Sequence, residues 1–247
     1  MTAQTGPFYV GTSGWSYQHW RGRFYPKKLP ASQWLLFYTE HFRTVEINAS
    51  FYRLPKRSVF KSWRKQVPQG FVFAVKGSRY LTHLKRLKEP AEPVERLMKS
   101  ATGLGAALGP LLYQLPPKME RDDQRLEDFL RTLAPEQQHV LEFRNKSWLS
   151  SAVFDLLRRY NVALCAHDMK KSETPPEVTA SFGYVRLHGS LAPFTGRYSD
   201  RMLKGWAQRL MDMRSLGARK VYVYFNNDVQ AHAVKNAKKL IEILAAS

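Results

Sequence analysis

Charged and amide side chains stand at the ends of several strand-like apolar segments, where they could carry chemistry. The segments are TVEIN (44–48), LLYQLPP (111–117), VLEFR (140–144), YVRLHG (184–189) and VYVYFNND (221–228). Each is rich in Val, Leu, Phe or Tyr, as buried strands are. In α/β proteins, ligands bind at the C-terminal ends of the strands. The pattern therefore predicts a ligand site built from these polar residues.

Glu46, Glu142 and His188 are the candidate catalytic residues. A carboxylate among apolar walls can act as a general acid or base, and a histidine can donate or accept a proton. Two carboxylates that span a site would also suit glycoside hydrolysis. The competing interpretation is structural, with the carboxylates in salt bridges to nearby cations and His188 as a hydrogen-bond partner. The sequence leaves both interpretations open.

The cations Lys76, Arg144 and Arg186 indicate an anionic ligand, because a guanidinium binds phosphate or carboxylate in a bidentate manner. No glycine-rich phosphate loop is present, since Gly103 and Gly105 precede a strand rather than a helix, and a nucleotide cofactor is not expected. The full set of expected substrate-binding residues is Trp15, Asn48, Tyr52, Lys76, Gln114, Arg144, Asp168, Arg186, Asn226 and Asn227.

A divalent metal is conceivable as a cofactor but is not favoured. The oxygen and nitrogen donors for it would be Glu46, Glu142, Asp168, His188 and Asp228. However, the sequence lacks the paired-histidine motif of zinc enzymes. The lone cysteine, in VALCA (162–166), excludes an intramolecular disulfide and is interpreted as a small core residue.

Eight strand candidates alternate with amphipathic stretches, which predicts a single (β/α)8 barrel of the TIM type spanning residues 1–247. We expect the strands at 8–12, 43–47, 71–76, 109–115, 138–143, 162–166, 183–188 and 220–225. We expect helices at 33–42, after Ser58, Asp122, Ser150 and Ser199, and from about Val229 to Ala245. The sixth unit is irregular, because Pro175 and Pro176 leave room for only a short helix.

Strand parity sorts the polar residues onto one face. Val45 and Ile47 share one side of their strand, whereas Glu46 lies on the other, and the other clear strands divide in the same way. The uniformly apolar faces must meet the helices, so the mixed faces point into the barrel. The same parity rule, applied to the strands with a less clear pattern, predicts that Lys76, Gln114 and Asp168 also point inward. Such groups are costly to bury unless they pair or meet a ligand.

The chain is strongly basic, with 39 Lys and Arg against 20 Asp and Glu and a formal net charge of +19. No acidic residue occurs between Ile47 and Lys88, a stretch that holds eleven Lys and Arg residues. Aromatic side chains, among them Trp15 and Tyr52, follow the first two strands beside further basic residues. This composition indicates an anionic partner, DNA or RNA among the candidates. The competing interpretation is a basic surface without a dedicated partner.

The chain has neither a signal-peptide pattern at its N-terminus nor an apolar run of about 18 residues. We therefore expect a cytoplasmic location and no membrane partner. The oligomeric state stays open.

Seven segments together resemble the YecE-like family, also described as domain of unknown function 72. They are GTSGWSYQHW (11–20), FYPKKLP (24–30), FRTVEINASFYRLP (42–55), LGPLLYQLPP (108–117), LEFRNKSW (141–148), YVRLHG (184–189) and YFNND (224–228). The resemblance runs through nearly the whole chain and implies a TIM-type barrel. It implies no reaction, because the family has no settled activity. The family's motif residues found in this chain are Trp15, Glu46, Asn48, Tyr52, Gln114, Pro116, Glu142, Arg144, Trp148, Arg186, His188, Gly189, Asn226 and Asn227.

Three functional hypotheses follow from these residues. The first is an enzyme acting on a phosphate-containing substrate, most simply a phosphodiester hydrolase, with Glu46 or Glu142 as the base and His188 as the proton donor. In it, Lys76, Arg144 and Arg186 would stabilise charge on the phosphoryl oxygens. The second is a non-catalytic nucleic-acid-binding barrel, and the third is a small-molecule or sugar hydrolase whose basic surface is incidental.

Overall fold

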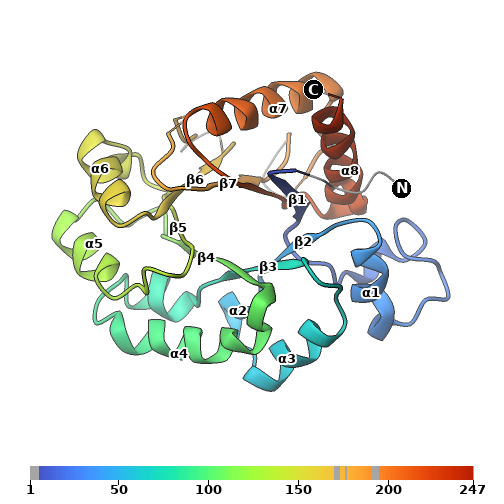
Figure 1. The fold of residues 1–247 in the computed structure, drawn as a ribbon, viewed down its shortest axis with the longest axis horizontal. Coiled ribbons are helices and arrows are strands. Elements are labelled where there is room, and N and C mark those ends of the chain that lie inside the picture. Colours follow the sequence, from blue (N-terminus) through green and yellow to red (C-terminus); the bar gives the residue numbers. More distant parts are fainter. Residues whose placement is uncertain (1–5, 170–172, 176, 191–194, 247) are drawn as a thin grey trace.

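The computed structural model describes residues 6–169, 173–175, 177–190 and 195–246. Eight parallel strands form one nearly closed barrel in the order β1-β8-β7-β6-β5-β4-β3-β2 (Figure 1). The strands are β1 (Phe8–Thr12), β2 (Thr44–Ile47), β3 (Val72–Lys76), β4 (Leu108–Gln114), β5 (His139–Glu142), β6 (Ala163–His167), β7 (Gly183–Leu187) and β8 (Val221–Phe225). The predicted barrel and all eight predicted strands are confirmed.

Helices surround the barrel (Figure 1). They are α1 (Trp34–Thr39), α2 (Ala49–Tyr52), α3 (Arg57–Lys65), α4 (Ala91–Ala101), α5 (Asp123–Leu130), α6 (Ser151–Arg159), α7 (Asp200–Ser215) and α8 (His232–Ala245). Short 3-10 turns lie at Gln18–Trp20, Ala31–Gln33, Thr102–Ala107, Lys146–Trp148 and Val229–Ala231, and a π-turn lies at Tyr80–Leu84.

Three of the expected N-caps form as the sequence predicts. The side chains of Asp122, Ser150 and Ser199 each accept a hydrogen bond from the backbone three residues on, which satisfies a free helical N–H. Ser58 does not act this way, because α3 already begins at Arg57. Between β6 and β7, none of the described residues (168, 169, 173–175 and 177–182) is helical. The irregular sixth unit is thus seen in the part that the structure describes.

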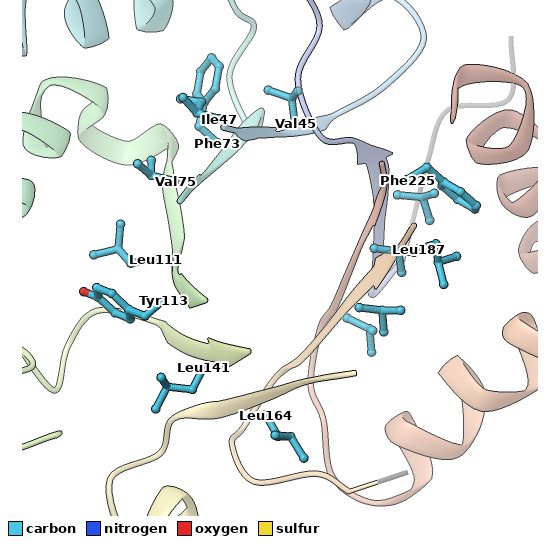
Figure 2. Packing of buried hydrophobic residues seen from close by; sticks show 14 of the residues in the cluster. Val45, Ile47, Phe73, Val75, Leu111, Tyr113, Leu141, Leu164, Leu187 and Phe225 are labelled. Carbon is cyan, nitrogen blue, oxygen red and sulfur yellow. The ribbon is translucent and has the colours of Figure 1, made fainter. Parts of the chain in front are cut away.

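The two faces of the barrel wall have different side chains, as parity predicts. Figure 2 shows Val45, Ile47, Leu111, Leu141 and Phe225 pointing away from the barrel into the layer beneath the helices. A second, smaller cluster fills the inside of the barrel, where its members include Leu112, Val140, Cys165, Tyr184, Tyr222 and Tyr224. The polar residues next in register therefore lie above this inner cluster, at the C-terminal end of the strands.

The seam between β1 and β2 closes by close backbone approach. A Cβ on Gly11 would lie 2.2 Å from the carbonyl oxygen of Thr44, so no larger residue fits at this point. Beyond β1, Ser13 forms an isolated parallel bridge with Glu46, and Gly14 N–H donates to the carbonyl of Glu46 at 2.8 Å. The closure fixes the strand that carries Glu46.

Among the described residues, none of the helices combines the length and the apolar content that a membrane span requires.

Candidate functional site

The centre of the site is an ion-pair network at the C-terminal end of the barrel. Arg186, from β7, lies between the carboxylates of Glu46, from β2, and Glu142, from β5. Its Nη2 donates to Glu46 Oε1 at 3.0 Å, and its Nη1 donates to Glu142 Oε2 at 2.6 Å. All three side chains are buried, and such charges persist away from water only when they pair and form hydrogen bonds. One guanidinium therefore joins strands on different sides of the barrel.

Glu46 has its oxygens fully engaged. Ser13 Oγ donates to Oε1 at 2.7 Å, beside the Arg186 bonds, and the Tyr184 hydroxyl donates to Oε2 at 2.6 Å. Burial alone would raise the pKa of Glu46, but the charge of Arg186 and the Tyr184 hydrogen bond outweigh it and hold the pKa below its ordinary value. A carboxylate that is ionised and saturated with donors is poorly suited to act as a general base.

Glu142 is held in the same way by two guanidinium groups. Besides its bond to Arg186, it forms an ion pair through Oε1 with Nη2 of Arg144. Oε1 accepts no hydrogen bond within the described residues, so this second contact is ionic only. Burial would raise the pKa of Glu142, but Arg144 and Arg186 together hold it well below its usual range. Glu142 thus fixes the position of both arginines.

His188, at the end of β7, is a neutral acceptor for these arginines. Its Nε2 lies 2.9 Å from Arg144 Nη2 and 3.4 Å from Arg186 Nη1. Because guanidinium groups only donate, Nε2 must carry a lone pair and Nδ1 the proton. Burial lowers the pKa of His188 to about 4, although the hydrogen bond to Asp168 opposes the change. At neutral pH His188 therefore holds no excess proton to give to a substrate.

Behind His188, Asp168 orients the ring. Asp168 Oδ1 accepts the backbone N–H of His188 at 2.9 Å and lies 3.5 Å from its Nδ1. The hydroxyl of Tyr198, in the loop after β7, donates to Asp168 Oδ2 and accepts the backbone N–H of Gly189 at 2.7 Å. Gly189 has φ of 125°, which favours glycine, so its amide can turn toward Tyr198. Asp168 thus supports His188 and does not enter the central network.

Lys76, at the end of β3, is the remaining buried cation. It is only 8% exposed, yet no carboxylate lies within 4.0 Å of its ammonium in the part of the chain that the structure describes. The Nζ atom instead lies 4.2 Å from the centroid of the Phe51 ring. Burial and the nearby charge of Arg186 lower the pKa of Lys76 to about 8, although the charges of Glu142 and Glu46 act to raise it. Lys76 is therefore still protonated at neutral pH.

Four predicted binding residues stand at the strand ends, and two of them have a polar atom without a partner among the described residues. Asn48, which precedes α2, has its side-chain Oδ1 buried in this state, and Arg144 has its Nε in the same state. Gln114 and Asn226 are partly buried at the ends of β4 and β8. Together with Lys76, these groups form a polar mouth above the ion-pair network.

Three predicted binding residues lie elsewhere. The ring of Trp15 packs edge-on against Trp63 at 5.1 Å, under α3 rather than in the mouth. Asn227 donates through Nδ2 to the carbonyl of Gly196 at 2.8 Å and to Asn236 Oδ1 at 3.1 Å, which ties the β7–α7 loop to α8. Tyr52 is highly exposed on α2, outside the mouth.

The sequence interpretation missed His167. Its Nε2 lies 3.0 Å from the carbonyl of Phe143, and its ring meets His188 edge-on with 6.1 Å between centroids. Burial lowers its pKa, so it too is neutral at pH 7. Parity could have found it, because His167 shares the inner face of β6 with Cys165, whereas the residue chosen, Asp168, comes after the strand has ended.

The acids and histidines that the structure describes do not assemble into a metal site. Within the described ranges, no group of three or more His, Cys, Asp or Glu side chains is placed to hold a metal ion. The Arg186 guanidinium occupies the position between Glu46 and Glu142. A sugar ring has no place between these two carboxylates in this arrangement.

Besides Asp168, a second carboxylate at this end of the barrel lies outside the arginine network. Asp228, after β8, contacts only the exposed ring of His19 among its ion-pair partners in the described residues, at 3.4 Å. Burial raises the pKa of Asp228, whereas the arginines hold the pKa values of Glu46 and Glu142 below their ordinary range. Burial raises the pKa of Tyr17, and the charges of Asp228 and Glu46 add to this effect, so Asp228 belongs to the same end of the barrel as Glu46.

Comparisons with known proteins agree with this architecture. The chain is 26% identical to UPF0759 protein YunF of Bacillus subtilis (strain 168), over 96% of this chain and 94% of that protein. A DUF72 family protein from Thermotoga maritima MSB8 superposes with a TM-score of 0.86 at 28% identity, covering 97% of this chain and 99% of that one. A DUF72 family protein from Enterococcus faecalis V583 has the same fold, with a TM-score of 0.82 at 19% identity over 97% of this chain and 96% of that one.

The family profile described as "Protein of unknown function DUF72" matches residues 9–247. This range includes all the polar groups of the mouth and all eight strands, apart from the first residue of β1. The chain therefore belongs to the DUF72 family of TIM-type barrels.

Proposed function

We propose that the mouth of the barrel binds a phosphate-containing anion and that the protein is an enzyme acting on a phosphoester bond of that ligand. The observation that carries the proposal is the buried ammonium of Lys76, which has no carboxylate within ion-pair distance among the described residues. A buried cation is costly without a counter-charge, and an anionic ligand supplies one. The C-terminal face is also where TIM-type barrels bind their ligands.

The charges of the mouth support an anion rather than a cation as the ligand. Glu46 and Glu142 contribute two negative charges, and both are taken up by Arg186 and Arg144. Lys76 adds a third positive charge, so these five side chains carry one cation in excess, with Asp168 and Asp228 outside their contacts. Lys76 and Arg144 would stabilise the negative charge that develops on the phosphoryl oxygens. Asn48 Oδ1, which has no partner within the described residues, adds an acceptor for a ligand hydroxyl.

The roles assigned from sequence change with this geometry. Glu46 and Glu142 hold arginines in place, and His188 accepts hydrogen bonds from those arginines, so none of the three is our candidate base or acid. Asp228, whose pKa is raised by burial and whose carboxylate has no arginine partner among the described residues, is the better candidate for proton transfer.

Sulfate binding by calorimetry tests the anion site, because sulfate does not titrate in the relevant pH range. Lys76→Met should weaken binding by about 10- to 100-fold, the value of one charge-assisted hydrogen bond. Lys65→Met is the matched control, since Lys65 is exposed in the same acid-free stretch and should leave affinity unchanged. Affinity should also fall as the pH rises through about 8, where Lys76 loses its proton. Equal sulfate affinity in the wild type and Lys76→Met would refute the proposal.

Turnover is tested with bis(p-nitrophenyl) phosphate as the probe. Asp228→Asn should abolish a measurable rate while sulfate affinity stays as in the wild type. If the protein binds sulfate through Lys76 but cleaves no phosphoester with or without divalent metals, the anion site is supported and the proposal that the protein is an enzyme is wrong.

A further inference from the structure

An aromatic surface leads from the exterior of the barrel to Lys76. It consists of Phe51, Tyr52 and His83, and we refer to it as the Tyr52 platform. The Phe51 ring meets the Tyr52 ring at 5.1 Å and the His83 ring at 5.1 Å, both nearly edge-on, and it lies 4.2 Å from the Lys76 ammonium. The platform thus connects an exposed ring to the buried cation through a single intervening side chain.

Short turns after β2 and β3 hold the platform in place. The α2 turn is anchored by Ser50, whose Oγ lies within donor distance of the carbonyls of Ile47 at 3.0 Å and Lys76 at 2.6 Å. His83 lies in the π-turn after β3, where its Nδ1 contacts Thr82 Oγ1 at 2.9 Å. Because the anchors are buried and local, the platform is fixed relative to Lys76 without help from the rest of the surface.

Tyr52 is exposed to an unusual degree for an aromatic residue. Its side chain is 81% exposed, more than any other large apolar side chain in the part of the chain that the structure describes. A tyrosine of this kind contributes little to packing, but it offers a flat face to a ligand. Base stacking on such a face is sequence-tolerant, because every base has a π-face.

Two exposed cations flank the platform along the chain. Arg53 follows Tyr52 directly, Arg79 precedes the π-turn, and both are exposed with no ion-pair partner among the described residues. Both belong to the stretch between Ile47 and Lys88, which contains no acid. Cations spread over an exposed surface, rather than gathered in a pocket, suit an extended polyanion.

We propose that the ligand is a single-stranded nucleic acid, with an unpaired base stacked on Tyr52 and adjacent phosphates on Arg53 and Arg79. The strand then continues along the Tyr52 platform, and one of its phosphodiesters enters the mouth at Lys76. The inference rests on the proposed anion site and names its substrate class. Paired bases cannot stack on the platform in this way, so a duplex is expected to bind more weakly.

The test is fluorescence anisotropy with labelled oligothymidylate and oligouridylate of about 12 nucleotides, a length in the range of single-strand sites. Tyr52→Ala should weaken binding by about 5- to 100-fold, whereas Tyr52→Phe, which keeps the ring, should retain wild-type affinity. Leu216→Ala is the control for removing an exposed apolar side chain, as Leu216 is 61% exposed at the end of α7. Arg53→Ala and Arg79→Ala should each reduce the salt slope by about 0.7.

The outcomes separate this inference from the proposed function. Oligonucleotide binding that Tyr52→Ala leaves unchanged, or that a duplex of the same length matches, overturns the inference. If sulfate binding still depends on Lys76 in that case, the anion site stands and its substrate is a small phosphate compound. If sulfate binding is independent of Lys76, while Tyr52→Ala still weakens strand binding, the proposed function fails and the platform stands. Comparing oligouridylate with oligodeoxyuridylate of the same length, which differ only in the 2′-hydroxyl, shows whether that group is needed.

Discussion

The two buried cations of the barrel mouth have opposite surroundings. In the network that links β2, β5 and β7 across the barrel, which we call the paired side, Arg186 is buried between two carboxylates that each bond to it. On the β3 side, Lys76 is almost as buried, but its ammonium lies beside the Phe51 ring and has no carboxylate within 4.0 Å among the described residues. Both cations stand near the C-terminal ends of their strands, and the charge of Arg186 helps to lower the pKa of Lys76. The ion pairs of Arg186 are those of a residue that stabilises the fold. The surroundings of Lys76 are those of a residue that binds an anionic ligand.

This difference separates stability from function within one site. An ion pair that is already satisfied gains little from a ligand, but it loses much when one partner is removed. A buried cation that lacks a counter-charge lowers the free energy of unfolding, and it increases the affinity for an anionic ligand. The same substitution, cation to methionine, should therefore have opposite effects on the two sides.

The largest expected effect is on the paired side. Arg186→Met leaves Glu46 and Glu142 buried without the cation they share, and we expect the free energy of unfolding to fall by about 3–5 kcal/mol. Urea denaturation measures the change. If this variant does not fold, Glu142→Gln, which keeps the side-chain shape, should still lose more than 1 kcal/mol. A loss below that value in both variants would show that the network does not support the fold.

Local pattern was enough to predict the barrel and the inward position of its charges. Glu46 stands between Val45 and Ile47, and a period of two assigns opposite faces to such neighbours whatever the rest of the chain does. The same rule holds for Glu142 and Arg186. Strand parity is a property of a few adjacent residues, so the sequence alone reveals it.

The pairing of those charges could not be predicted, because it depends on residues far apart in the chain. Glu46 and Arg186 are 140 residues apart, and their contact depends on how a twisted barrel brings β2 opposite β7. Parity assigns a face only to residues within a strand. Asp168 follows β6 and contacts His188, whereas His167 lies within the strand. The loop residue Trp15 lies beyond β1, and its ring packs outward on Trp63.

A pH effect of intermediate size should appear at His188, which contacts the paired side. It faces Arg186, Arg144, Asp168, Glu142 and His167, and burial lowers its pKa from 6.5 to about 4. The unfolded chain then binds more protons, so stability should fall as the pH drops from about 6.5 to 4. The shift corresponds to roughly 3 kcal/mol at most.

Urea titrations between pH 7 and 4 test this prediction. His188→Gln, which can still accept a bond from Arg144, should flatten the decline relative to the wild type. His139 has a similarly low pKa of about 4 and remains in both proteins, so the difference between them isolates His188. Glu46, Glu142 and Asp168, whose pKa values are held low, lose their contributions only below about 4.5. Parallel pH profiles for the two proteins would mean that His188 is already charged in the fold.

The smallest expected change, and the one of opposite sign, is on the unpaired side. Lys76→Met removes a buried charge whose cost, from the lowered pKa, is roughly 3 kcal/mol at most, and it also removes a cation–π contact worth about 1 kcal/mol. We therefore expect a gain in stability of about 1–2 kcal/mol at pH 7. The gain should shrink as the pH rises from about 8 to 10.5, because folded wild-type Lys76 is then neutral while the unfolded chain still binds the proton. Lys65→Met should change stability by no more than about 0.5 kcal/mol. A loss of stability in Lys76→Met comparable to that of Arg186→Met would mean that both sides of the mouth are structural and that the anion site must be sought elsewhere.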